Sequence, residues 1–129
     1  FVGKPTNEII KYHKIALKLQ DVALNTLRPG VKASDVDKAV INAAKELGVI
    51  DYLLHHSGHG LGLETHEAPF LDIGDNTVLR PGMVITVEPG IYIPGLGGFR
   101  HSDTVVVRED GIEVITYYPR DTDSLIVEV

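Results

Sequence analysis

The sequence contains no cysteine among its 129 residues, and this absence excludes two kinds of site. Without cysteine the chain can form neither a disulfide framework nor a thiolate metal site, so a bound metal would need histidine and carboxylate ligands. The absence of cysteine is also compatible with a reducing compartment, and we expect a cytoplasmic protein.

Long apolar runs and clusters of positive charge are missing as well. No apolar run approaches the roughly 18 residues that cross a bilayer, so we expect no transmembrane helix and no membrane partner. The start of the chain lacks the basic segment and apolar core of a signal peptide. With 12 basic against 18 acidic residues, and a net charge of -6, the chain is not expected to bind nucleic acid.

What remains is the composition of an ordinary globular domain, with 43% hydrophobic residues to supply a core. A chain of 129 residues is long enough for one domain and too short for two, so we predict a single domain over residues 1–129. The first residue is Phe1 and not methionine, so we expect a fragment of a longer protein or a processed chain.

Two segments before Gly48 have the periodicity of helices. Apolar residues recur every three or four positions from about Thr6 to Leu27, and Pro29 then ends the pattern. The second helix is predicted to begin at Ser34 as its N-cap, with Asp37 three residues later in a variant of the capping box. Gly48 fits the C-terminal cap of this helix.

After Gly48 the pattern changes to β-branched residues that alternate with a period of two. The segment Glu109-Asp110-Gly111 is typical of a hairpin turn, because glycine accepts the positive φ that such turns need. Two helices followed by antiparallel strands predict an α+β fold. The predicted strands are Met83–Val87, Ile91–Ile93, Thr104–Val107 and Ile112–Thr116.

Histidines are concentrated between His55 and His66, where four of the six are found. Gly58 and Gly60 flank His59, so another chain, a metal or a substrate could approach the backbone closely there. His66 is seven residues further along the chain and could join the same pocket from a neighbouring strand. The alternative interpretation is that these histidines line a solvated turn.

Two further groups of polar residues interrupt apolar strands. Glu88 ends a strongly apolar segment just before Pro89, and glutamate is rarely buried unless it is paired or bound to a cation. Alternatively, Glu88 is simply the first solvated residue after its strand. Arg100, His101 and Asp103 enter the next apolar segment, where an exposed ion pair between Arg100 and Asp103 is the simpler interpretation.

Taken in order, these pieces resemble one family, the Xaa-Pro dipeptidases and aminopeptidases with their creatinase relatives. The opening from Phe1 to Pro5, with a helix after it, is similar to the segment that lies after the first metal-binding hairpin in that family. The resemblance implies the C-terminal part of a "pita-bread" domain, with two helices packed on a curved, mostly antiparallel sheet. It rests on Gly-His-Gly-Leu-Gly around His59, His66-Glu67, Pro81-Gly82-Met83, Glu88-Pro89-Gly90, and the strand from Arg100 to Asp103.

The resemblance also implies a proline-specific metallopeptidase acting on a peptide or dipeptide with proline in the second position. Family members hold two divalent ions with two Asp, one His and two Glu, and activate a water molecule for attack on the scissile carbonyl. Carried over, His59 and Glu88 would be metal ligands. His66 would stabilise the tetrahedral intermediate, His55 would line the substrate pocket, and Arg100 would be a further catalytic residue. Suitable ions are Mn, Co, Zn or Fe, and a homodimer is a further expectation from the resemblance.

Two departures from the family bear on these expectations. The two Asp ligands would lie on a hairpin upstream of Phe1, so residues 1–129 would require an upstream segment and would be inactive alone. Ser102 stands fourteen residues after Glu88, where the family has its bridging Glu. A neutral hydroxyl replaces that carboxylate poorly, so we expect one ion or two, with the second in doubt. Alternation along the strand points His101 and Asp103 to the face opposite Ser102.

Two other functions stay open on the sequence alone. One is a metal-independent, creatinase-like C–N hydrolase in which His59 serves as acid and base. In creatinase the position matching His101 holds a substrate-binding acid, which this chain lacks. The other is a catalytically inactive binding module that has kept the scaffold.

Overall fold

Helix α1 spans Asn7–Thr26 in the computed structural model, which describes residues 1–129. It begins where the Thr6 hydroxyl accepts a hydrogen bond from the Ile9 N–H at 3.3 Å, the expected N-cap contact. The Leu27 N–H donates to the Ala23 carbonyl and closes the last turn. The predicted first helix is therefore confirmed to within one residue at each end.

Helix α2 spans Ala33–Glu46, and its start differs from the prediction. Lys32 is the N-cap residue, while Ser34 lies buried inside the first turn and Asp37 is bonded elsewhere. The first amides of the helix, those of Ala33 and Ser34, donate to loop carbonyls of Thr77 and Asp75 at 2.9 and 2.8 Å. Tertiary contacts thus satisfy the amides that a side-chain cap would otherwise serve, and the predicted Ser34 cap is wrong.

The end of α2 agrees with the prediction. Gly48 adopts φ +69°, the left-handed conformation that favours glycine after a helix. Its amide donates to the Lys45 carbonyl, and the Val49 amide donates to Ala44 at 2.9 Å.

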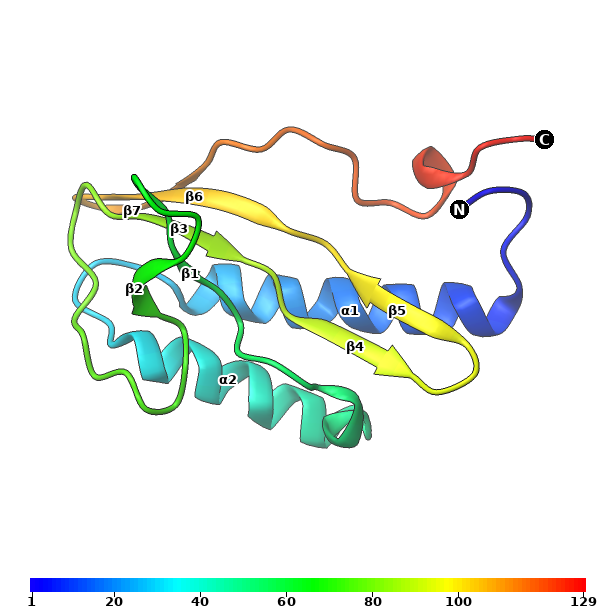
Figure 1. The fold of residues 1–129 in the computed structure, drawn as a ribbon, viewed down its shortest axis with the longest axis horizontal. Helices are drawn as coiled ribbons and strands as arrows, with labels where there is room; N and C mark the ends of the chain where they lie inside the picture. Colours follow the sequence, from blue (N-terminus) through cyan, green and yellow to red (C-terminus); the bar gives the residue numbers. More distant parts are fainter.

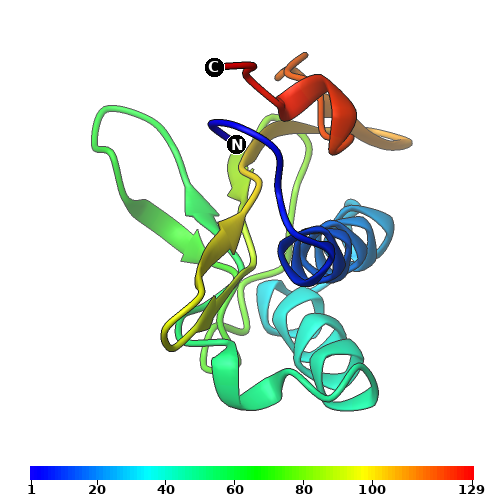
Figure 2. The same cartoon turned by 90° about the vertical axis from the view of Figure 1, so that its right-hand side faces the viewer.

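Seven strands come after the two helices along the chain, and all their pairings are antiparallel (Figure 1). Five of them form one sheet in the order β2-β1-β3-β6-β7, and β4 pairs with β5. Figure 2 shows both helices on the same side of the strands, so the α+β prediction is confirmed. The strands are β1 His59–Gly60, β2 Glu67–Phe70, β3 Val84–Val87, β4 Gly90–Ile93, β5 Gly97–Arg100, β6 Asp103–Arg108 and β7 Gly111–Val114.

The four predicted strands correspond to β3, β4, β6 and β7, and a turn before Gly111 joins the last two as expected. However, Gly111 does not adopt the positive φ that was the reason for predicting this turn, so that reason was wrong. Strands β1, β2 and β5 were not predicted, because β1 has only two residues, β1 and β5 contain glycine, and β2 contains Pro69. No helix of the structure is both long enough and apolar enough to span a membrane.

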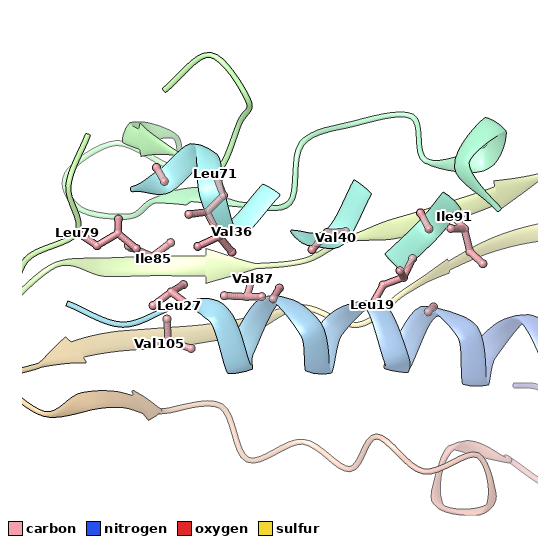
Figure 3. Packing of buried hydrophobic residues seen from close by; sticks show 14 of the residues in the cluster. Leu19, Leu27, Val36, Val40, Leu71, Leu79, Ile85, Val87, Ile91 and Val105 are labelled. Carbon is pink, nitrogen blue, oxygen red and sulfur yellow. The ribbon is translucent and has the colours of Figure 1, made fainter. Parts of the chain in front are cut away.

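The core lies between the helices and the sheet (Figure 3). Ile85 and Val87 of β3, with Val105 of β6, are fully buried in one cluster with Leu27 and Val36 from the helical layer. Because β3 is the middle strand of its sheet, this packing fixes the strand from which Glu88 emerges.

Two glycines allow the chain around His59 to run against neighbouring backbone. A Cβ atom added at Gly58 would stand 1.9 Å from the Thr86 carbonyl oxygen, and one at Gly60 would stand 2.5 Å from that of Ala68. Both distances are shorter than any side chain can tolerate. The predicted close approach to the backbone is therefore confirmed, but the group that approaches is the chain's own backbone and not another chain, a metal or a substrate.

We expect Gly58→Ala to destabilise the fold by about 3 kcal/mol or more, because the added methyl group would push β3 away from the His59 segment. Gly111→Ala is the matched control, since a Cβ there would meet nothing within 4 Å. Urea unfolding of both variants measures the difference. Similar free energies of unfolding for the two variants would contradict this account of the close approach.

Candidate metal and catalytic site

His59 and Glu88 meet where β1 and the end of β3 lie side by side. Strand β1 pairs antiparallel with β3, and Gly60 is opposite Ile85. His59 Nε2 lies 3.0 Å from Glu88 Oε1, and the two side chains are 6% and 18% exposed. Glu88 is therefore a mostly buried acid with a partner, and its interpretation as a solvated strand end is wrong.

The hydrogen bond of the His59 ring determines its tautomer, and therefore whether the nitrogen near Glu88 carries a proton or a lone pair. Nδ1 lies 2.9 Å from the Gly60 carbonyl oxygen, which can only accept, so Nδ1 carries a proton. In neutral imidazole the Nε2 lone pair then faces a carboxylate oxygen. Two acceptors in contact need a proton or a cation between them. A metal-binding histidine commonly donates its other N–H to a carbonyl in this way.

Thr86 links the backbone of His59 to the side chain of Glu88. Its hydroxyl oxygen accepts from the His59 amide at 3.1 Å and donates toward Glu88 Oε1 at 3.2 Å. Thr86 and Glu88 are two positions apart, so strand alternation places both side chains on the same face. The carboxylate thus has support from the strand that carries it.

His66 and Arg100 lie on the exposed side of the pair. The rings of His66 and His59 have centroids 4.2 Å apart, so the predicted convergence of these two histidines is confirmed. Arg100 reaches Glu88 Oε2 at 3.9 Å with half of its side chain exposed. The interpretation of these histidines as a solvated turn is wrong for His59, which is buried, although His66 is exposed.

His55 is close to the pair in sequence but belongs to a separate contact. Its Nδ1 donates to the His56 carbonyl at 2.8 Å, so Nε2 accepts from the Tyr92 hydroxyl at 2.8 Å when the ring is neutral. A Cβ at Gly90 would lie 3.1 Å from His55 Nε2 and 3.2 Å from Arg100 Cβ. The absence of a side chain at Gly90 thus leaves room for this contact beside Arg100.

Tyr92 is a residue of this region that the sequence interpretation missed. It stands two positions after Gly90 on β4, so its side chain returns to the face of the strand that Gly90 leaves open. The alternation from Glu88 through Gly90 to Tyr92 was the available signal. His55 also lines a cavity of about 260 Å³ with Leu53 and Asp72, and its role in a substrate pocket stays a prediction.

Ser102 lies opposite Glu88 on the neighbouring strand segment. Val87 is opposite Asp103 in the β3–β6 pair, and Gly90 is opposite Arg100 in the β4–β5 pair. The same register across the gap between the two pairs places position 102 opposite position 88. Ser102 is exposed, so a neutral hydroxyl occupies the position beside the carboxylate.

His101 and Asp103 point away from Ser102, as alternation predicts. His101 Nε2 lies 3.3 Å from Asp103 Oδ1, and the two side chains are 11% and 5% exposed. Arg100 contacts Glu88 and not Asp103, so the simpler interpretation of an Arg100–Asp103 ion pair is wrong. Neither side chain can replace a carboxylate at position 102.

Two buried acids near the site have pKa values shifted in opposite directions. Burial alone would raise the pKa of Asp103, but hydrogen bonds from Thr116 and Gln20 outweigh it and lower that pKa. Burial raises the pKa of Asp37, and two hydrogen bonds from Ser57 offset only part of the effect. Asp103 is therefore well solvated by the protein as an anion, and Asp37 less so.

As a donor set, His59 and Glu88 fit a divalent transition metal. An imidazole nitrogen and a carboxylate oxygen are suitable ligands for Mn, Co, Zn or Fe. No group of three histidine or carboxylate side chains within residues 1–129 could hold a metal ion. The chain thus offers two ligands of a larger set.

Comparison with known proteins identifies relatives with this fold. Residues 1–109 match the model of metallopeptidase family M24. The chain is 44% identical over 120 residues to an Xaa-Pro dipeptidase from Pyrococcus furiosus, a match that covers 93% of this chain and 34% of that protein. An X-Pro aminopeptidase structure from Thermotoga maritima matches 99% of this chain and 35% of its own, with a TM-score of 0.91 and 36% identity.

A third relative, the structure of an Xaa-Pro dipeptidase from Bacillus anthracis, is 40% identical with a TM-score of 0.90. It matches 99% of this chain and 35% of that one. The chain thus spans about a third of the length of these relatives. By its match over most of its length, the chain belongs to metallopeptidase family M24, and its helices and antiparallel sheet are part of that family's pita-bread fold.

Proposed function

We propose that the protein carrying this chain hydrolyses the peptide bond between an N-terminal residue and proline, using a divalent metal. The observation that carries the proposal is the approach of His59 Nε2 to Glu88 Oε1 at 3.0 Å while Nδ1 is committed to a carbonyl. Relatives named Xaa-Pro dipeptidase and X-Pro aminopeptidase support the choice of substrate, a peptide or dipeptide with proline second.

In this proposal His59 and Glu88 would be two of the ligands that hold the metal. A bound divalent ion would lower the pKa of a water molecule and polarise the substrate carbonyl. His66, exposed beside His59, would donate a hydrogen bond to the carbonyl oxygen as negative charge develops there, and the ring contact between the two histidines supports this role. Arg100, whose guanidinium lies 3.9 Å from Glu88 Oε2, would contribute positive charge at the open side of the pair.

We further propose that residues outside 1–129 supply the remaining metal ligands. A catalytic metal site normally has at least three protein ligands, and this chain brings only two together. Residues 1–129 alone would then be inactive, as the resemblance implies. The identity of the ion, among Mn, Co, Zn and Fe, and the number of ions remain part of the proposal.

We expect removal of metal by dialysis against a chelator to abolish cleavage of Ala-Pro by the natural-length protein, meaning the whole protein that carries residues 1–129. Addition of Mn²⁺ or Co²⁺ should restore it. The loss should be at least about a hundredfold, because metal stabilisation of the transition state is worth several kcal/mol. His59→Ala should lose activity that no metal restores. Activity that persists at full rate in strong chelator would contradict the proposal and favour a metal-independent hydrolase.

Ser102→Glu should increase the number of divalent ions bound per chain in the natural-length protein. Side chains directly opposite on antiparallel strands lie about 5 Å apart at Cβ, so the new carboxylate would stand beside Glu88. Asn76→Glu adds the same charge on an exposed loop and serves as the control. Elemental analysis after purification without chelator gives the count. Equal metal content in both variants would argue against a role for position 102.

A further inference from the structure

The peptide unit that joins Val87 to Glu88 is held at both of its polar atoms by groups from outside its own strand. The Val87 carbonyl oxygen accepts a hydrogen bond from Gln20 Nε2 at 2.8 Å, and Gln20 belongs to α1. The Glu88 N–H donates to the Ser57 carbonyl at 2.8 Å. The backbone from which the Glu88 side chain leaves is therefore fixed on two sides.

Ser57 is itself held by the second helix. Asp37 Oδ1, on α2, accepts from the Ser57 amide at 3.0 Å and from the Ser57 hydroxyl at 2.6 Å. Ser57 stands two residues before His59 and carries the carbonyl that binds the Glu88 amide. Asp37 thus reaches the backbone of both members of the pair through one residue.

Gln20 is an unusual occupant for the interior of a helix–sheet interface. It is fully buried, and its Oε1 has no hydrogen-bond partner. Both of its N–H donors are used, one on Val87 and the other on Asp103 Oδ2 at 2.9 Å. A buried amide with an unpaired oxygen stabilises a core less than an apolar side chain of similar size. The amide instead provides two N–H donors, and these bind the ends of β3 and β6 that are nearest to Glu88.

Asp37 presents a similar case on α2. It is 4% exposed, and no lysine, arginine or histidine forms an ion pair with it. A buried carboxylate without a cation costs free energy unless hydrogen bonds compensate. Its two shortest hydrogen bonds come from the amide and the hydroxyl of Ser57, and the Leu71 carbonyl shares the Ser57 amide at 3.0 Å. The carboxylate therefore helps to fix the position of Ser57.

We propose that Gln20 and Asp37 are positioning residues that hold the Val87–Glu88 peptide so that the Glu88 side chain faces His59. Neither residue forms a hydrogen bond with the side chain of His59 or Glu88, and each acts through the backbone. The proposal deepens the proposed function, because the group they position is the candidate metal pair. It also makes a prediction about the metal-free protein, which can be tested separately.

Amide hydrogen exchange of the metal-free protein tests the positions directly. We expect Gln20→Met and Asp37→Ala to accelerate exchange at the Glu88 amide by about tenfold relative to core amides such as Val105, since each removes hydrogen bonds worth about that factor. Val40→Ala is the matched control, because Val40 is a fully buried apolar residue of α2 with no side-chain hydrogen bond. It should accelerate exchange without favouring Glu88.

The affinity for Mn²⁺ of the natural-length protein gives the second readout, at a temperature where every variant is folded. Gln20→Met and Asp37→Ala should weaken binding by roughly tenfold or more, the usual effect of residues that orient ligands. Val40→Ala should leave the affinity unchanged. Asp37→Asn keeps an oxygen acceptor for Ser57 and should recover part of the loss.

The outcomes separate the two proposals. If the parent protein binds no Mn²⁺, the metal function fails, and the exchange experiment still decides whether Gln20 and Asp37 hold the peptide. If exchange at Glu88 changes no more in Gln20→Met and Asp37→Ala than in Val40→Ala, the positioning role is overturned. Should Asp37→Ala fail to fold, Ser57→Ala removes only the hydroxyl hydrogen bond. A smaller acceleration, again centred on Glu88, is then expected, and its absence would overturn the Asp37 part.

Discussion

The contact between the His59 segment and β3 is the constraint on which the candidate site depends. A side chain at Gly58 would collide with the Thr86 carbonyl, so only glycine permits the two backbones to lie at this distance. Once they do, the Thr86 hydroxyl bonds to the His59 amide and lies beside the Glu88 carboxylate. The 3.0 Å separation between His59 Nε2 and Glu88 Oε1 thus follows mainly from the register of the two backbone segments, and little from the choice of side-chain rotamer.

The helices contribute more than an apolar cover for the sheet. Their apolar residues bury β3 and β6, but each helix also sends one buried polar side chain toward the end of β3. The environments of the two buried acids, Asp103 and Asp37, differ in whether they favour the ionised or the protonated carboxyl group. Asp103 receives hydrogen bonds from Gln20 and Thr116 that lower its pKa, so the anion suits its site. Asp37 keeps a raised pKa, so the chain retains a carboxylate there at some cost in stability above the ordinary pKa of aspartate.

Much of the fold was predictable because hydrophobic periodicity and the residues that cap helices or form turns are local features of the sequence. The first helix was placed correctly, since its capping threonine and its apolar spacing both lie within the helix itself. The Ser34 cap was wrong because loop carbonyls from residues 75 and 77 satisfy the amides of α2, and no local pattern reveals them. Strand β1 is two residues long and is defined by its partners, so its own sequence could not indicate it.

The same distinction applies to the candidate site. Residue types, glycine spacing and the resemblance brought His59, His66 and Glu88 together on the sequence, and the structure places them in contact. Gln20 was not singled out on the sequence, and Asp37 was interpreted only as a capping residue. Their partners lie 67 and 20 residues away, and separations of that kind become visible only once the sheet register is known.

The charge around His59 and Glu88 would favour fewer bound cations than a site with two carboxylates would. Glu88 is the single acid at this point, and the Arg100 guanidinium lies 3.9 Å from it and cancels part of its charge. Ser102, directly opposite, adds none, and alternation keeps Asp103 on the other face with His101. A first divalent ion would meet one carboxylate and one imidazole. A second would meet the repulsion of the first with no further anion from these strands to offset it, so any second ion would depend on carboxylates from elsewhere in the protein.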